Sequence, residues 1–130
     1  MAINTAGQTI TGNAPGTDTP QIKTGRIVLD GTSITAADFI VVALGFTPRY
    51  ITVDNVTDRI KVEWYEGMAA DTCVKTAAAG TRTIETTNQG LTVCDSDGTA
   101  NTKGRYFKIS QNATLAVVAA SKVLSWLAEG

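Results

Sequence analysis

The stretch RIKVEWYE, residues 59–66, decides the fold class of this chain. Its apolar residues Ile60, Val62 and Trp64 alternate with Arg59, Lys61, Glu63 and Tyr65. Successive side chains of a β-strand point to opposite sides, so this period of two is typical of a strand with one buried face. We therefore expect a strand here, with Trp64 in the core.

The same kind of pattern recurs on both sides of this stretch. In residues 49–56, Ile51 and Val53 are separated and flanked by polar residues. In residues 105–110, Phe107 and Ile109 are placed in the same way. Clusters of Gly, Asn and Asp separate the apolar runs and indicate turns. The predicted strands are residues 25–31, 39–46, 49–56, 59–66, 71–77, 81–87, 105–110 and 121–129.

Two of these runs indicate their place in a sheet. Residues 81–87 hold one large apolar residue, Ile84, as in a strand near an edge. Residues 121–129 carry apolar residues on both faces, which favours a central strand. Residues 114–124 stay ambiguous, because their alanines allow a helix whereas their valines favour a strand. Residues 34–39 allow one helical turn at most.

Composition supports the same fold class. The chain has 130 residues, enough for one domain, and holds 21 Thr against 4 Glu. Thr is β-branched and suits a half-exposed pleated surface. We expect an all-β fold, an antiparallel β-sandwich or jelly-roll-like barrel of about eight strands, formed by residues 25–130.

Residues 1–24 differ from the rest and are expected to form an extended N-terminal arm. Their large apolar residues are only Ile3, Ile10 and Ile22, so the segment buries too little apolar surface to fold alone. One interpretation is a flexible tail. The other is an arm that becomes ordered against a neighbouring subunit, with the three isoleucines as anchors.

The chemistry-bearing residues argue against an enzyme. The chain has no His, which removes the commonest general base and the commonest zinc ligand. No phosphate-binding glycine motif occurs. We therefore expect no catalytic residue, no metal and no cofactor. A net charge of −1 without a basic stripe argues against nucleic acid and against an anionic membrane surface, and no run is long enough to span a membrane.

The two cysteines and residues 95–106 give no evidence of a functional site. Cys73 and Cys94 form no CxxC motif, so they are either one disulfide or two free thiols, with free thiols expected in a bacterial cytosol. Residues 95–106 resemble a calcium loop only superficially, because the glycine comes too early and the twelfth position is Tyr106. A plain turn is expected there. The chain begins without a basic or apolar leader, so no secretory signal is expected.

A candidate interaction surface follows the stretch GFTPRYITVDN, residues 45–55. Pro48 suits the start of a strand, so we expect a corner between two strands here. Phe46, Arg49, Tyr50 and Tyr65 belong to the densest aromatic and arginine cluster of the chain, a composition that interfaces favour. The alternative for Phe46 is a place in the core.

The residues 44–87 carry a resemblance to a known class of proteins. The pattern GF-x-PRY, then V-x-N-x-T, then EW-x-EGM resembles small virion structural proteins of tailed bacteriophages, and the final WLAEG gives weaker support. Residues 1–24 and 95–104 take no part in it. The pattern is not catalytic, so the resemblance transfers no active-site residue.

What the resemblance implies is a capsid decoration or cement protein. Such a protein is non-enzymatic and rich in β-structure, and it binds and stabilises the outer surface of the phage head. Its expected partners are the major capsid protein and other copies of itself, most often in a homotrimer. It would be made in the cytoplasm of the bacterial host and end in the virion. The alternative is a tail or tail-fibre receptor-binding domain, or a neck or tail structural protein.

Overall fold

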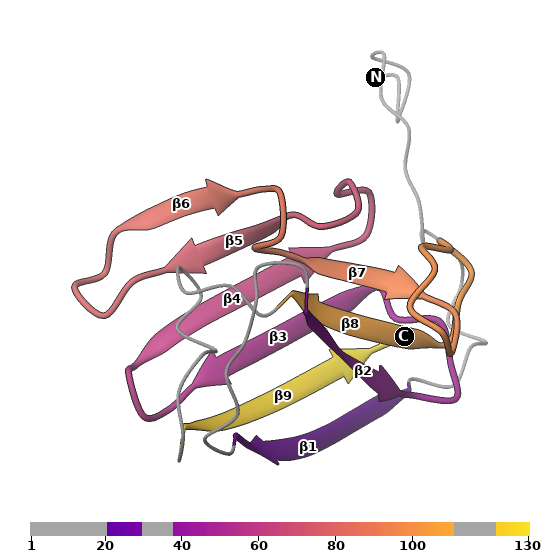
Figure 1. Ribbon diagram of the computed structural model, residues 1–130, viewed down its shortest axis with the longest axis horizontal. Helices are drawn as coiled ribbons and strands as arrows, with labels where there is room; N and C mark the ends of the chain where they lie inside the picture. Colours follow the sequence, from indigo (N-terminus) through magenta and orange to yellow (C-terminus); the bar gives the residue numbers. More distant parts are fainter. Residues whose placement is uncertain (1–20, 30–37, 111–121) are drawn as a thin grey trace, which may run out of the picture.

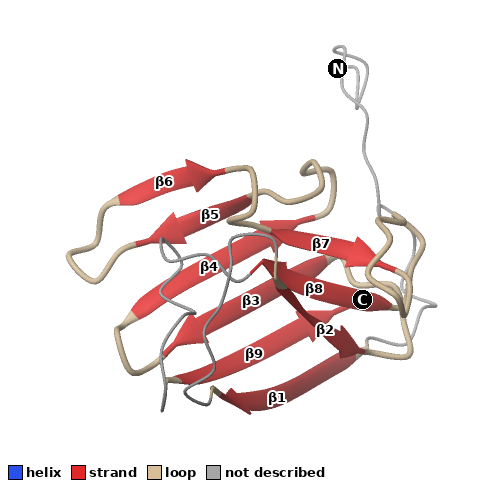
Figure 2. Cartoon of the chain, viewed as in Figure 1, coloured by secondary structure: helices blue, strands red, loops and turns tan. Residues whose placement is uncertain are grey.

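The computed structural model describes residues 21–29, 38–110 and 122–130. Within these residues the chain forms nine β-strands in two antiparallel sheets and contains no helix. The two sheets pack face to face, with the smaller one in front of the larger one in Figures 1 and 2. The expected all-β fold class is confirmed, in its sandwich form.

The large sheet has six strands in the order β1-β9-β3-β4-β5-β6. The last strand of the sequence, β9, lies second in this order, between β1 and β3. Its predicted central position is therefore confirmed, and so is the edge position of the strand with Ile84. The bounds are β1 Ile22–Val28, β3 Tyr50–Asn55, β4 Ile60–Tyr65, β5 Cys73–Thr76, β6 Arg82–Glu85 and β9 Val123–Glu129.

The small sheet has three strands in the order β2-β8-β7. Its bounds are β2 Phe39–Ala43, β7 Leu91–Cys94 and β8 Tyr106–Ser110. The chain passes from β2 in the small sheet to β3 in the large one at the predicted corner. There Gly45 has a φ of 85°, a value that favours glycine, and Pro48 is buried.

The core lies between the two sheets. The ring of Phe107 from the small sheet meets Trp126 from the large sheet edge to face, with centroids 5.5 Å apart. Gly25 of β1 makes room for this tryptophan, because a Cβ at that position would lie 2.4 Å from the Trp126 ring. The core therefore constrains an edge strand as well as the central ones.

The β3–β4 hairpin forms the middle of the large sheet. Ile51 lies opposite Trp64 and Val53 lies opposite Val62, and all four are buried beneath the small sheet. The alternating residues face outward, where Tyr50 and Tyr65 oppose each other. The predicted faces of both strands, including the core position of Trp64, are confirmed.

The β5–β6 hairpin lies at one end of the sheet and is much less covered. Cys73 of β5 is fully buried, but three of the four residues of β6 are exposed. Figure 1 shows β6 beyond the area that the small sheet overlies. This end of the sheet consequently offers backbone and side chains to the surroundings.

Two details differ from the sequence-based expectation. Strand β7, Leu91–Cys94, was not predicted, because all four of its residues are buried and no alternation marks it. Strand β1 begins at Ile22, three residues before the predicted domain start, so residues 22–24 pair with β9 instead of belonging to an arm. The expectations for residues 1–20, for a helical turn near residue 35 and for residues 114–121 lie outside the described residues.

Candidate functional site

The most distinctive surface lies on the outer face of the β3–β4 hairpin. The rings of Tyr50 and Tyr65 stand side by side with centroids 5.1 Å apart, and both hydroxyls donate hydrogen bonds to the Glu63 carboxylate, at 2.9 and 2.8 Å. Arg82 of β6 approaches the same carboxylate from its other side, at 3.7 Å. We call this group, together with the neighbouring ion pair, the tyrosine patch. Its members are Arg49, Tyr50, Glu63, Tyr65, Glu66 and Arg82.

The carboxylate at its centre is stably charged. Partial burial would raise the pKa of Glu63, but the hydrogen bonds from Tyr65 and Tyr50 and the nearby cations outweigh burial and lower that pKa. The same hydrogen bond from Tyr65 raises the pKa of its phenol. The two tyrosines and Glu63 thus hold one another in fixed rotamers at neutral pH.

A second ion pair fixes the entrance of the hairpin. Arg49 Nε donates to Glu66 at 2.8 Å, and the Glu66 amide donates to the Arg49 carbonyl at 2.8 Å. The Arg49 amide in turn donates to the carbonyl of Glu129 in β9. Both side chains are about half exposed, so the pair itself contributes little stability, but it presents charge at a defined place.

The structure separates the predicted interface residues. Arg49, Tyr50 and Tyr65 come together in the tyrosine patch. Phe46 does not join them: it is only 8% exposed, lies in the core and packs beside Gly130. Its assignment to an interface is therefore corrected to the alternative, a core residue.

Of the three isoleucines of the predicted arm, only Ile22 lies within the described residues. Ile22 lies in β1, where its side chain is 62% exposed. Its register partner is Glu129, which also opposes Tyr50, so Ile22 lies two strands from the tyrosine patch on the same face. Ile3 and Ile10 lie outside the described residues.

Sequence reasoning missed three members of the patch: Glu63, Glu66 and Arg82. A usable signal existed for Glu63, because the alternation puts it on the same face as Tyr65, two residues away. Nothing in the sequence pointed to Arg82, since its approach depends on the order of strands in the sheet.

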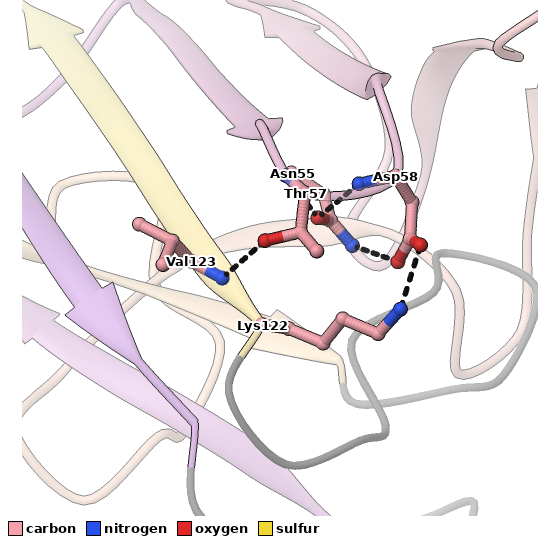
Figure 3. Close-up of polar contacts among 5 residues, drawn as sticks. All are labelled: Asn55, Thr57, Asp58, Lys122 and Val123. Carbon is pink, nitrogen blue, oxygen red and sulfur yellow. Dashed lines mark hydrogen bonds and ion pairs between the residues drawn. The ribbon is translucent and has the colours of Figure 1, made fainter.

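A second polar network joins the β3–β4 turn to the start of β9 (Figure 3). The side chain of Asn55 accepts hydrogen bonds from the amides of Thr57 and Asp58 and donates to the Asp58 carboxylate. Lys122 donates to Asp58 at 2.6 Å, and the amide of Val123 donates to the Thr57 hydroxyl at 3.0 Å. The hydrogen bond from Lys122 lowers the pKa of Asp58, helped by Asn55.

This network explains much of the pattern on which the resemblance rests. Asn55 and Thr57 are its polar members, whereas Phe46 and Trp64 are core residues. Gly67, with a φ of 95°, turns the chain after β4. Most of the pattern therefore builds the β3–β4 hairpin and its connections, and only Arg49, Tyr50, Glu63 and Glu66 reach the tyrosine patch.

Asp71 organises a third polar network, between the two sheets. Its carboxylate accepts from the amides of Asn88 and Gly90 and from the hydroxyl of Ser110, and its own amide donates to Thr92. Asp71 lies two residues before the start of β5, and Thr92 and Ser110 lie in β7 and β8. The network fastens the β5–β6 end of the large sheet to the small sheet.

Both cysteines are free and fully buried. Burial raises the pKa of the Cys73 thiol to about 12 and also raises that of Cys94. Thiolates are the reactive species, so both thiols are inert at neutral pH. This settles the choice between a disulfide and free thiols in favour of free thiols.

One cavity of about 120 Å³ lies between the β4–β5 connection and β7. An engineered apolar cavity of roughly 150 Å³ accepts benzene, so this one has room for a single small apolar group. Its lining contains no titratable residue: Trp64, Met68, Ala70, Thr92, Val93, Ala100, Asn101 and Thr102.

The described part of the chain holds no cluster of three His, Cys, Asp or Glu residues that could ligate a metal ion. Asp95 and Asp97 instead bind within their own turn, to Asn101 and Thr99. Over the same residues, no helix has the length and apolar character to cross a membrane.

Comparisons with known proteins return no similar protein: no family model matches the chain, and no curated protein or solved structure is significantly similar to it. The features that bear on function are therefore the fold, the tyrosine patch and the resemblance in residues 44–87.

Proposed function

We propose that this chain is a non-enzymatic structural protein of a tailed-bacteriophage virion, a decoration or cement protein that binds the outer surface of the head shell. It acts without a cofactor. The observation that carries the proposal is the tyrosine patch, which is a rigid aromatic and charged surface on the exposed face of a compact β-sandwich. The major capsid protein is the proposed partner.

The patch has the composition and rigidity that a binding surface needs. Tyrosine and arginine are enriched among the residues that dominate interface energies. The hydroxyls of Tyr50 and Tyr65 are already held by Glu63, so their rings lose little conformational freedom when a partner covers them. Tyr65 is 43% exposed and is the more exposed of the two tyrosines.

The sandwich beneath supports the same role. The patch stands on the central hairpin of the large sheet, and the inward-facing residues Ile51, Val53, Val62 and Trp64 of that hairpin are buried. A cement protein has to resist deformation, and strands held by a core on one face present the other face at fixed geometry. A head carries many copies of its shell protein, so weak single contacts add up through avidity.

The proposal is tested on heads of the phage that encodes the chain, assembled after its reading frame is disrupted. Purified protein is added back, and its occupancy is measured on sedimented heads and by electron microscopy. We expect saturable binding to heads, and higher resistance of the heads to heat. Tyr65→Ala should lower apparent affinity at least tenfold, a loss of about 1.4 kcal/mol. Arg26→Ala, an exposed change on the edge strand β1, is the matched control and should bind as wild type.

Two results would contradict the proposal. Heads that stay undecorated at saturating protein would exclude head binding. Protein found only on tails would instead support the alternative, a tail or receptor-binding domain.

A further inference from the structure

Strand β6, Arg82–Glu85, is the outermost strand of the large sheet, and among the described residues it pairs only with β5. Its other edge therefore presents unpaired backbone groups, which can template pairing with another strand. On the outer face of this edge stands Ile84, whose side chain is 64% exposed. The exposed isoleucine adds apolar surface that a second strand paired to this edge can bury.

The β5–β6 ladder fixes which backbone groups point outward. The amide of Ala77 donates to the carbonyl of Thr81 at 2.9 Å, just beyond the register pair Thr76 and Arg82. In antiparallel pairs, hydrogen-bonded and non-bonded positions alternate. The bonds to β5 are therefore made by Thr83 and Glu85, and the N–H and C=O groups of Arg82 and Ile84 point toward the free edge.

We propose that β6 pairs antiparallel with β6 of a second copy of this chain, about a two-fold axis that passes beside Ile84. The axis is perpendicular to the sheet, so it keeps the outer faces of both copies on one side. The two large sheets then become one continuous sheet. Ile84 lies opposite Ile84 of the second copy, and Arg82 lies opposite Thr86 of the second copy.

Charge and burial select this register from the four that the symmetry allows on this strand. A register centred on Arg82 opposes two arginines, and one centred on Glu85 opposes two glutamates, and both are unfavourable. A register centred on Thr83 opposes Arg82 to Ile84. Only the register centred on Ile84 buries the two isoleucines against each other without opposing like charges.

A two-fold contact of this kind closes at two copies. It therefore predicts a dimer, which differs from the trimer that the resemblance implies. It uses the free edge of β6, whereas head binding is proposed for the tyrosine patch, and Arg82 is the residue that the two surfaces share. Neither proposal depends on the other.

The register can be trapped with a cysteine. Opposed Cα atoms at a hydrogen-bonded pair are about 5.5 Å apart, within the roughly 4.4–6.8 Å that a disulfide spans. The full chain with Ile84→Cys should form a covalent dimer under mild oxidation, seen on a non-reducing gel. Ile22→Cys is the matched control, because Ile22 is 62% exposed and also lies on an edge strand. That variant should stay unlinked, and the buried Cys73 and Cys94 should not react.

Sedimentation velocity gives an independent readout. The wild-type chain should sediment as a concentration-dependent dimer, and Ile84→Lys should sediment as a monomer because it opposes two cations. Ile84→Pro should also sediment as a monomer, because it removes the N–H that would donate to the second copy. It removes no hydrogen bond to β5. Both variants should keep the wild-type melting temperature when the wild type is measured below its dimerisation range.

A wild-type monomer at high concentration, a trimer, or a dimer that survives Ile84→Lys would overturn the pairing. Equal cross-linking of the two cysteine variants would also overturn it. A monomeric wild type that still occupies heads would leave the head-binding proposal standing.

Discussion

The two hairpins of the large sheet, β3–β4 and β5–β6, have the same antiparallel pairing but differ in how far the small sheet covers them. The inner face of β3–β4 is sealed by the small sheet, and its outer face carries the tyrosine patch. The β5–β6 hairpin has one fully buried residue, Cys73, and exposes Ile84. Pairing of strands alone does not stabilise a hairpin in water, so the difference lies in what covers each one.

The two hairpins therefore have different roles within one sheet. The covered hairpin supplies stability and a rigid outer face. The uncovered hairpin is held mainly by its pairing with β4 and by the Asp71 network, and it keeps an unpaired edge. The stable part of the sheet is thus its middle, and the capacity for further pairing is located at its β6 end.

The largest expected effect comes from making the same substitution in both hairpins. Ile51→Ala in β3 removes a fully buried side chain and should lower the free energy of unfolding by about 2–5 kcal/mol. Ile84→Ala in β6 should change it by less than about 0.5 kcal/mol, because most of that side chain is already exposed. Urea denaturation of the monomer measures both. Equal losses would show that β6 is buried in the free protein.

A smaller effect should follow from cutting the tie between the uncovered hairpin and the small sheet. Asp71→Ala leaves the amides of Asn88 and Gly90 and the Ser110 hydroxyl without their acceptor, and should cost about 2–3 kcal/mol. Asp71 has a φ of 57°, which Asn tolerates, so Asp71→Asn should lose less. Hydrogen exchange should speed up in β5 and β6 more than in β3 and β4. A uniform change across the sheet would contradict this local role.

The smallest expected effect is a dependence on pH in the tyrosine patch. Because the folded-state pKa of Glu63 is lowered from 4.5, its charged form stabilises the fold above that pH. This stabilisation, less than about 1 kcal/mol for a group near the surface, is lost as the pH falls through the lowered pKa. The stability difference between wild type and Glu63→Gln should therefore shrink in acid. A difference that grows in acid would reverse the assigned sign.

Most of the fold follows from alternation in the sequence. The faces of β3, β4 and β8 were predictable because one side of each is buried and the other is not. Strand β7 was not, because Leu91–Cys94 is buried on both faces and has only four residues. The start of β1 at Ile22 was hidden by polar residues that edge strands tolerate, and by Gly25, whose purpose becomes clear only beside Trp126.

The candidate site was predictable only where its residues are close in sequence. Arg49, Tyr50 and Tyr65 are close in sequence and flank one hairpin, so their meeting follows from local structure. Phe46 stands at a corner without alternation, where nothing distinguishes a core aromatic from an exposed one. Arg82 reaches Glu63 across β5, which lies between β4 and β6 in the sheet. This order of strands is non-local, and no short stretch of sequence predicts it.

The position of β9 in the sheet also affects the order in which the strands can pair during synthesis. Ile22 of β1 and Tyr50 of β3 both pair with Glu129 of β9. Among the described strands β1 has no other ladder partner, whereas β3 also pairs with β4. Closing such long loops is slow, because their entropy is lost before the contacts form. During synthesis β3 and β4 emerge one after the other, whereas the pairing of β1 with β9 has to follow the emergence of residues 123–129. In this sheet β9 therefore takes its place between two strands that are synthesised long before it.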